Sequence, residues 1–169
     1  IELKKVYLDN DHFVRDLQGY FKISDDKIVS AELNSFFENE EQLNFTIKTI
    51  DKKKITTFFS GVAIPIVNKY DFIKGYEEGS LDFYSINSNN ISNSKLKIYD
   101  FKLKQLPALT KLLTVASLQG IADLLSGEGI RFSEFEMNFE TNKNLMTINE
   151  IYAIGPAISI LMEGYSEKN

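Results

Sequence analysis

The segment that most constrains the fold is Pro107 to Gly129, the one long stretch with the pattern of a strongly apolar helix. Its apolar residues recur at helical spacing and widen into a stripe that leaves only a narrow polar edge. Pro107 suits a first helical turn and Gly127 suits the position after a helix end, so we expect a helix over 107–126. A helix this apolar needs cover around most of its circumference. The residues expected to pack it against a sheet are Leu109, Leu112, Leu113, Ala116 and Leu124.

Much of the remaining chain alternates apolar and polar residues, which is typical of strands with one buried face. The alternation runs through 17–23, 43–47 and 135–139, and polar segments such as 24–27 predict hairpin turns between the runs. Successive runs of this kind predict a meander of antiparallel strands. In the strand after the turn at 51–53, Ile55, Thr57 and Phe59 are expected to share the apolar face, with a polar opposite face.

Two local features interrupt this pattern. Ser60 is expected to cap a short helix over 61–70, and Pro65 excludes a long one. Near Tyr99 the apolar parity changes between Ile98 and Phe101. We therefore expect either a β-bulge near Tyr99 or a strand end that is buried on both faces.

Together these patterns predict a β-rich α+β chain. We expect a curved antiparallel sheet, a groove-like or taco-like meander, packed by one long apolar helix and one short helix. A weak internal repeat of hairpins, in 22–37 and 138–154, fits a long curved sheet. The alternation leaves two interpretations open: a dry, filled core of ordinary kind, or an apolar groove that receives acyl chains.

The composition limits the possible partners. With 169 residues, 43% of them hydrophobic, the chain is long enough for one domain with its own core. A formal net charge of −5 with scattered lysines argues against nucleic-acid binding, which needs a basic patch. Because the chain contains no cysteine, disulfides, thiolate catalysis and cysteine-based zinc sites are excluded.

The sequence offers no recognisable catalytic or metal-binding arrangement. His12 is the single histidine, and nearby Asp9, Asp11 and Asp16 lack the spacing of a calcium loop. On the strand 134–140, the glutamates are expected to form a solvated face. We therefore expect a non-enzymatic protein with no cofactor and no metal. The glutamates of that expected face are Glu134, Glu136 and Glu140.

Four segments occur in an order and spacing that match a known family. They are the strand end Tyr99-Asp100-Phe101-Lys102-Leu103, the helical run 112–121, the segment Leu124-Leu125-Ser126-Gly127-Glu128-Gly129-Ile130-Arg131-Phe132, and the hairpin end Gly155-Pro156-Ala157. On these four segments, the run from Gly79 to Gly164 resembles the AsmA-like C-terminal domain of bacterial envelope proteins, the group that includes AsmA and TamB.

The resemblance implies that residues 1–169 are a single section of an AsmA-like region. Upstream strands and the short helix would occupy 1–78, and the C-terminal core would occupy 79–165. Because the chain begins at Ile1, we expect it to be part of a longer protein. By resemblance, an N-terminal helix outside this sequence anchors the parent protein in the inner membrane and places this section in the periplasm.

The resemblance also implies a function in outer-membrane biogenesis and in phospholipid transport between the two membranes through a hydrophobic groove. The expected partners are phospholipid acyl chains and neighbouring repeats of the same chain. The alternative is a structural or interaction module in outer-membrane protein assembly, with no lipid ligand. The residues expected to line a groove are Leu43, Phe45, Ile47, Phe135, Met137, Phe139, Ile158, Ile160 and Met162.

Overall fold

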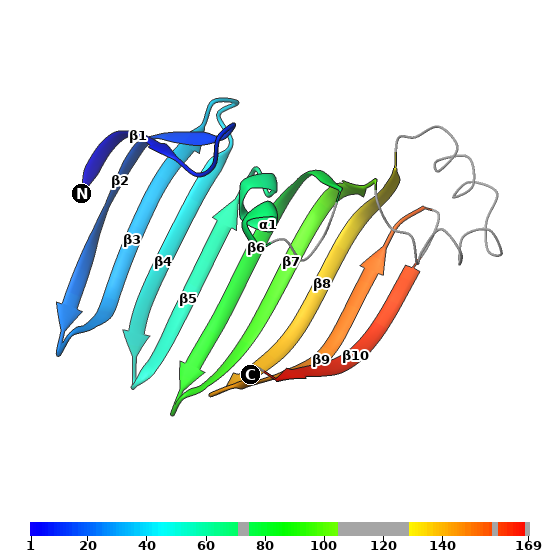
Figure 1. Cartoon of the computed structure of the whole chain (residues 1–169). Coiled ribbons are helices and arrows are strands. Elements are labelled where there is room, and N and C mark those ends of the chain that lie inside the picture. The colour runs from blue at the N-terminus through cyan, green and yellow to red at the C-terminus, as the bar shows by residue number, and fades with distance from the viewer. Residues whose placement is uncertain (71–74, 105–128, 157–158, 168–169) are drawn as a thin grey trace.

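Ten strands form one curved, open antiparallel sheet in a computed structural model that describes residues 1–70, 75–104, 129–156 and 159–167 (Figure 1). The strands follow one another in chain order across the sheet, from β1 to β10. This confirms the predicted β-rich antiparallel meander. The strands are β1 (Glu2–Tyr7), β2 (Phe13–Ser24), β3 (Lys27–Phe37), β4 (Gln42–Ile50), β5 (Lys53–Ser60), β6 (Tyr76–Ser88), β7 (Ile91–Leu103), β8 (Ile130–Asn142), β9 (Leu145–Ile154) and β10 (Ser159–Glu167).

Tight two-residue turns join several of these strands at one end of the sheet. The central pairs 25–26, 51–52 and 89–90 all have positive φ, between 48° and 67°. Two successive positive φ values are typical of a type I′ turn, which follows the natural twist of a hairpin. Asp and Asn tolerate this conformation better than bulky residues do, and they occupy five of these six positions. The turns predicted at 24–27 and 51–53 are therefore confirmed.

The parity change near Tyr99 has a different cause from either of the two predicted. Ile98 and Phe101 are three residues apart, yet both belong to one buried cluster. Asp100 lies between them with φ 52°, and the pairing of β7 with β6 and β8 continues without a register shift. One left-handed residue thus returns the apolar side chains to the same face. Neither the predicted bulge nor burial on both faces is needed.

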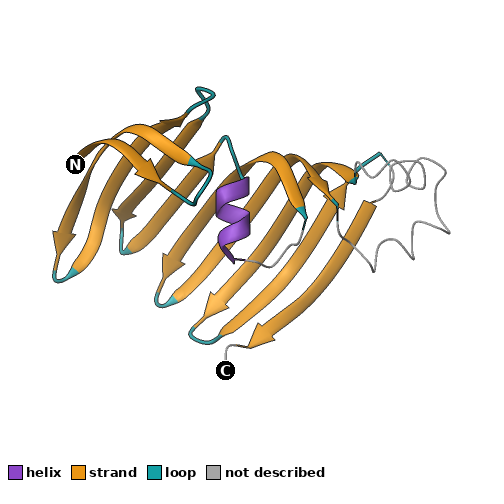
Figure 2. Cartoon of the chain, turned by 45° about the horizontal axis from the view of Figure 1, so that its top comes forward, coloured by secondary structure: helices purple, strands orange, loops and turns teal. Residues whose placement is uncertain are grey.

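The short helix α1 (Ile64–Tyr70) lies over the middle of the sheet (Figure 2). Val67 of the helix, and Ala63 just before the helix begins, pack in a core that includes Leu81 of β6. The predicted short helix is confirmed, and Pro65 lies in its first turn, where a missing N–H costs little. The predicted cap is wrong, because the Ser60 hydroxyl donates to the Val62 carbonyl at 2.6 Å and Ser60 ends β5.

The predicted long helix over 107–126 lies outside the described residues, as do its packing residues Leu109, Leu112, Leu113, Ala116 and Leu124. Only the coarser part of the predicted fold, a β-rich sheet with one short helix, is therefore observed. In the described residues, no helix has the length and apolar character needed to cross a membrane.

Three stacked aromatic rings occupy the core at the helix end of β6, β7 and β8. Tyr76 stacks on Phe101 with ring centroids 5.5 Å apart, and Phe101 stacks on Phe132 at 5.2 Å. Tyr76 is 4% exposed, and its hydroxyl has no hydrogen-bond partner among the residues that the structure describes. Burial raises the pKa of Tyr76. A buried hydroxyl without a partner is a source of instability in this core.

Replacing this tyrosine should stabilise the protein. We expect Tyr76→Phe to raise the free energy of unfolding by about 1–2 kcal/mol, because it removes the uncompensated desolvation of the hydroxyl and keeps the ring stack. The control is Tyr152→Phe, which removes hydroxyl hydrogen bonds to Glu134 and Glu136 at 3.1 and 3.2 Å and should destabilise the protein. Urea titration measures both; a loss of stability in Tyr76→Phe would contradict the assignment.

Candidate functional site

The face of the sheet that carries α1, called the apolar face here, is the candidate site. Cross-strand partners place one residue from each of eight consecutive strands in a single line across this face. Every member of this line, the central row, is apolar. The central row consists of Leu33, Phe45, Phe58, Phe83, Leu96, Met137, Ile151 and Met162.

The length of the central row follows from the strand spacing. Eight strands are separated by seven steps of about 4.8 Å, so the row extends for about 34 Å. Residues of this row from Leu33 to Ile151 are half-buried, and Met162 on the edge strand is 52% exposed. Their side chains are thus packed by lateral neighbours but keep accessible surface, unlike the core beneath α1.

The neighbouring row on the helix side is more deeply buried. Leu43 is 7% exposed, Leu81 is 4% exposed and Ile98 is 1% exposed. Ser35 also lies in this row, and its hydroxyl donates to the Leu43 carbonyl at 3.3 Å. This row is the packed core of the sheet, so the central row lies along the margin of that core.

The neighbouring row on the turn side changes character along its length. It is apolar at Ile47 and at Phe139, but hydroxyl residues replace apolar ones in the strands between them. Ser85 and Ser94 hydrogen-bond to each other through their hydroxyls at 2.9 Å. The apolar band on the middle strands is therefore bounded by a polar edge on its turn side.

The predicted groove residues fall on one face. Eight of the nine lie on the apolar face, and Ile158 lies outside the described residues. Leu43 and Ile47 are buried, with 7% and 6% exposure. The others are half-buried or exposed; they are Phe45, Phe135, Met137, Phe139, Ile160 and Met162.

Five members of the central row were not predicted, namely Leu33, Phe58, Phe83, Leu96 and Ile151. On β5 the predicted parity is wrong, because Phe58 pairs with Phe45 and Phe83 on the apolar face. Phe59 and its parity mates consequently lie on the opposite face. The adjacent Phe58-Phe59 pair gives either parity a large apolar residue, so alternation within β5 alone is ambiguous.

The opposite face, called the polar face here, carries a connected group of charges on β7, β8 and β9. Glu136 is 5% exposed and lies 2.7 Å from Lys95 and 2.8 Å from Lys97. Lys97 also contacts Glu134 at 3.2 Å. The Tyr152 hydroxyl donates to both carboxylates. The prediction of a solvated glutamate face is therefore wrong for Glu136.

These contacts shift the ionisation of the group. Burial alone would raise the pKa of Glu136, but hydrogen bonds from Lys95, Lys97 and Asn138 outweigh it and lower the pKa to about 2. Hydrogen bonds to Glu136 and Glu134 raise the pKa of Lys97. Burial, followed by the hydrogen bond to Glu134, raises the pKa of Tyr152 to about 12. The Glu136 carboxylate is thus held ionised by Lys95 and Lys97, and these contacts join β8 to β7.

A second set of ion pairs lies nearer the helix end of β6, β7 and β8. Glu78 is 2.8 Å from Lys102 and 3.2 Å from Arg131, and Glu77 is 2.8 Å from Lys104. In the described part of the chain, no three His, Cys, Asp or Glu side chains are grouped closely enough to hold a metal ion. Ion pairs between neighbouring strands are therefore the main feature of the polar face.

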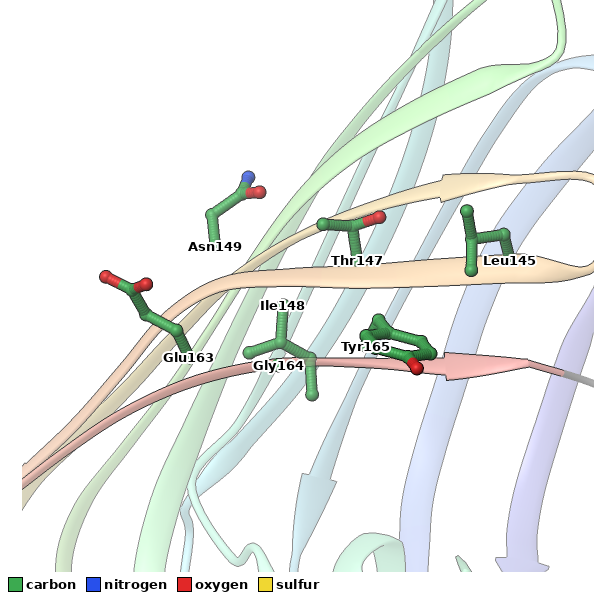
Figure 3. A pocket seen from close by; sticks show the side chains of 7 residues that line it. All are labelled: Leu145, Thr147, Ile148, Asn149, Glu163, Gly164 and Tyr165. Atoms are coloured by element: carbon green, nitrogen blue, oxygen red, sulfur yellow. The ribbon is translucent and has the colours of Figure 1, made fainter.

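An open hollow lies between β9 and β10 (Figure 3). It occurs where the pairing of β9 shifts register relative to both β8 and β10. Side chains from the two strands line it, including Asn149 and Glu163, which flank the irregularity. Because it is shallow and contains few convergent polar groups, it is a weaker candidate than the apolar face.

No protein-family model, curated protein or solved structure matches this chain. The AsmA-like resemblance therefore stays a prediction from the sequence.

Proposed function

We propose that the apolar face binds phospholipid acyl chains, and that this chain is a non-enzymatic section of an AsmA-like envelope protein that conducts lipid between the two membranes. The observation that carries the proposal is the central row, an apolar line across eight strands. Its length of about 34 Å exceeds the roughly 15 Å that half of a bilayer's hydrocarbon core occupies. An acyl chain can therefore lie along the row at full length.

The energetics favour such a position. Each methylene that leaves water for an apolar surface contributes about 0.8 kcal/mol, and the exposed parts of the central row lose contact with water as well. The hydroxyls of Ser85 and Ser94 form a polar edge on the turn side, where the hydrated headgroup of the lipid can lie. Acyl chains bind to one side of the sheet only, because an acyl chain on the polar face would take charged side chains out of water.

The cellular setting of the proposal depends on the resemblance. We propose a periplasmic location and an inner-membrane anchor in the parent protein, with a role in outer-membrane biogenesis. The mechanism is passive: acyl chains move along a continuous apolar surface whose successive positions offer similar contacts, so no step needs a reacting group.

The proposal predicts lipid capture on one face only. Photo-crosslinking side chains placed at Phe83 and Met162 should capture phospholipid in cells, because both positions lie in the central row. The matched controls are Tyr84 and Leu161, the next residues on the same strands, which are exposed on the polar face. Mass spectrometry of the purified adducts measures the captured lipid. Equal labelling of both faces, or none at Phe83 and Met162, would contradict the proposal.

An interaction module without a lipid ligand is the second candidate, and the two open edges of the sheet favour it. Among the described strands, β1 and β10 each pair on one side only. Unpaired strand edges are templates for a further strand. The crosslinking experiment separates the two candidates, since a module of this kind captures protein at its edges and no lipid on its apolar face.

A further inference from the structure

Two hollows lie on the polar face, one over β2 and β3 and the other over β4 to β7. The β2–β3 hollow has a volume of about 390 Å³, and its lining includes Tyr20 and Asn34. The β4–β7 hollow has a volume of about 370 Å³, and its lining includes Asn44 and Tyr84. Both volumes fall within the range of small-ligand sites, about 300–1,000 Å³. None of these strands lies at an edge of the sheet.

The two hollows meet and form one trough across the sheet. Asn34 of the first hollow and Asn44 of the second are direct cross-strand partners, whose Cβ atoms lie about 5 Å apart in such pairs. Phe59, Asp82 and Lys97 continue the same row as far as β7. Five steps of about 4.8 Å separate β2 from β7, so the trough is about 24 Å long. It can therefore hold a ligand that consists of several units.

Each hollow contains two aromatic side chains. Tyr20 is 49% exposed and Phe36 is 38% exposed in the β2–β3 hollow. In the β4–β7 hollow, Tyr84 is 43% exposed and Phe59 is half-buried. The face of an aromatic ring is apolar and carries partial negative charge, so it attracts C–H groups. Both hollows thus offer surfaces on which the C–H groups of a ligand can pack.

Amide side chains supply hydrogen-bonding groups between these aromatic residues. The Asn34 amide donates to the Glu32 carboxylate at 3.2 Å, and the Asn44 amide donates to the Gln42 side chain at 3.1 Å. A primary amide has two N–H donors and one acceptor oxygen, so each asparagine retains capacity for a ligand. Neighbouring donors and acceptors match the neighbouring hydroxyls of a sugar, because a hydroxyl both donates and accepts.

The charges of the trough disfavour an anionic ligand. Among the described residues that line the β2–β3 hollow, there is no lysine, arginine or histidine. In the β4–β7 hollow, Lys95 and Lys97 contact Glu136 at 2.7 and 2.8 Å. Asp82 is exposed and forms no ion pair with another described residue, because its cross-strand partner Lys97 contacts glutamates instead. A phosphate or sulfate would therefore meet like charge, whereas a neutral hydroxyl can donate to the Asp82 carboxylate.

We propose that this trough binds a neutral oligosaccharide. A sugar ring has C–H groups on its faces and hydroxyls around its rim, and an oligosaccharide repeats this arrangement along its length. The trough repeats the complementary arrangement, since each hollow combines two aromatic residues with an amide and a carboxylate. The site lies on the opposite face from the central row, so the proposal is independent of acyl-chain binding.

Isothermal titration calorimetry of the purified chain with cellohexaose, chitohexaose and maltohexaose tests the proposal. At least one hexasaccharide should bind. It should bind at least about tenfold more tightly than the disaccharide of the same linkage, because only the longer chain reaches both hollows. Tetragalacturonic acid is the anionic control and should not bind. A hexalysine peptide is the cationic control, and binding of this peptide in place of the sugars would overturn the proposal.

Ring removal tests the two hollows separately. Tyr20→Ala and Tyr84→Ala should each weaken binding of the hexasaccharide about tenfold, because each removes one packing surface. The matched control is Phe21→Ala, since Phe21 follows Tyr20 on β2 with 39% exposure but lies on the apolar face. This control should leave the affinity unchanged.

Four results would overturn the inference: no binding of any of the three hexasaccharides, equal affinity for the disaccharide and the hexasaccharide, unchanged affinity in both tyrosine variants, or an equal loss in Phe21→Ala. Both tyrosines are exposed, and circular dichroism checks that each variant keeps its sheet. If a variant loses its sheet signal, Tyr20→Leu or Tyr84→Leu replaces it. Leucine keeps an apolar side chain but has no aromatic face, so the same loss of affinity is expected.

Discussion

Phe132→Ala should lower the free energy of unfolding by about 3–5 kcal/mol, the range for removing a large buried aromatic side chain. Phe132 is 1% exposed and stacks on Phe101 at 5.2 Å in the cluster beneath α1. An open single sheet has few layers to absorb a cavity, because α1 is the only described helix that covers this face. Among the described residues, no further layer replaces the packing that is lost with the ring.

Guanidinium titration followed by circular dichroism measures this loss. The matched control is Phe36→Ala, since Phe36 is also a strand phenylalanine but lies on the polar face with 38% exposure. We expect the control to lose about 1 kcal/mol, as surface substitutions generally have small effects. Equal losses in the two variants would show that the cluster beneath α1 is not the stabilising core.

Much of the sheet is predictable from local sequence. Residues 43–47 and 135–139 alternate cleanly, and the structure places their apolar members on one face. The turns at 25–26 and 51–52 carry Asp residues that tolerate positive φ, so hairpins form where the sequence favours them. These short turns make the strands that they join antiparallel neighbours, as in the pairs β2–β3 and β4–β5.

Features that depend on long-range pairing were not predictable in this way. Phe58 lies on the apolar face because Phe45 and Phe83 flank it, a relation that alternation within β5 does not contain. The left-handed Asp100 keeps Ile98 and Phe101 on the same face by a single dihedral angle. The candidate site also depends on long-range pairing, because the central row can be identified only from the register of eight strands.

The charged residues of the polar face show that strand pairing can change the solvent exposure that alternation predicts for a side chain. Alternation in β8 puts Glu136 opposite the apolar residues, which predicts a solvated side chain. Pairing with β7 instead brings Lys95 and Lys97 beside it and leaves Glu136 5% exposed. Its carboxylate is consequently a structural group whose ionisation is coupled to folding.

Acid should destabilise the protein through Glu136. Its pKa is lowered from 4.5 to about 2 in the folded chain, so folding favours the ionised form. The resulting stability is fully present above about pH 4.5 and is lost as the pH falls toward 2. A difference of this size corresponds to on the order of 2–3 kcal/mol after screening by solvent. Urea titrations at a series of pH values measure the loss.

Glu136→Gln identifies the group responsible. The variant cannot ionise, so at neutral pH it should lose most of the stabilisation from the Lys95 and Lys97 contacts. Its stability should also fall less steeply than that of the unchanged chain between about pH 4.5 and 2, so that the two curves converge in acid. Glu140→Gln, on the same strand and face, is the control and should keep the original slope. Parallel curves for Glu136→Gln and the unchanged chain would show that other carboxylates cause the acid sensitivity.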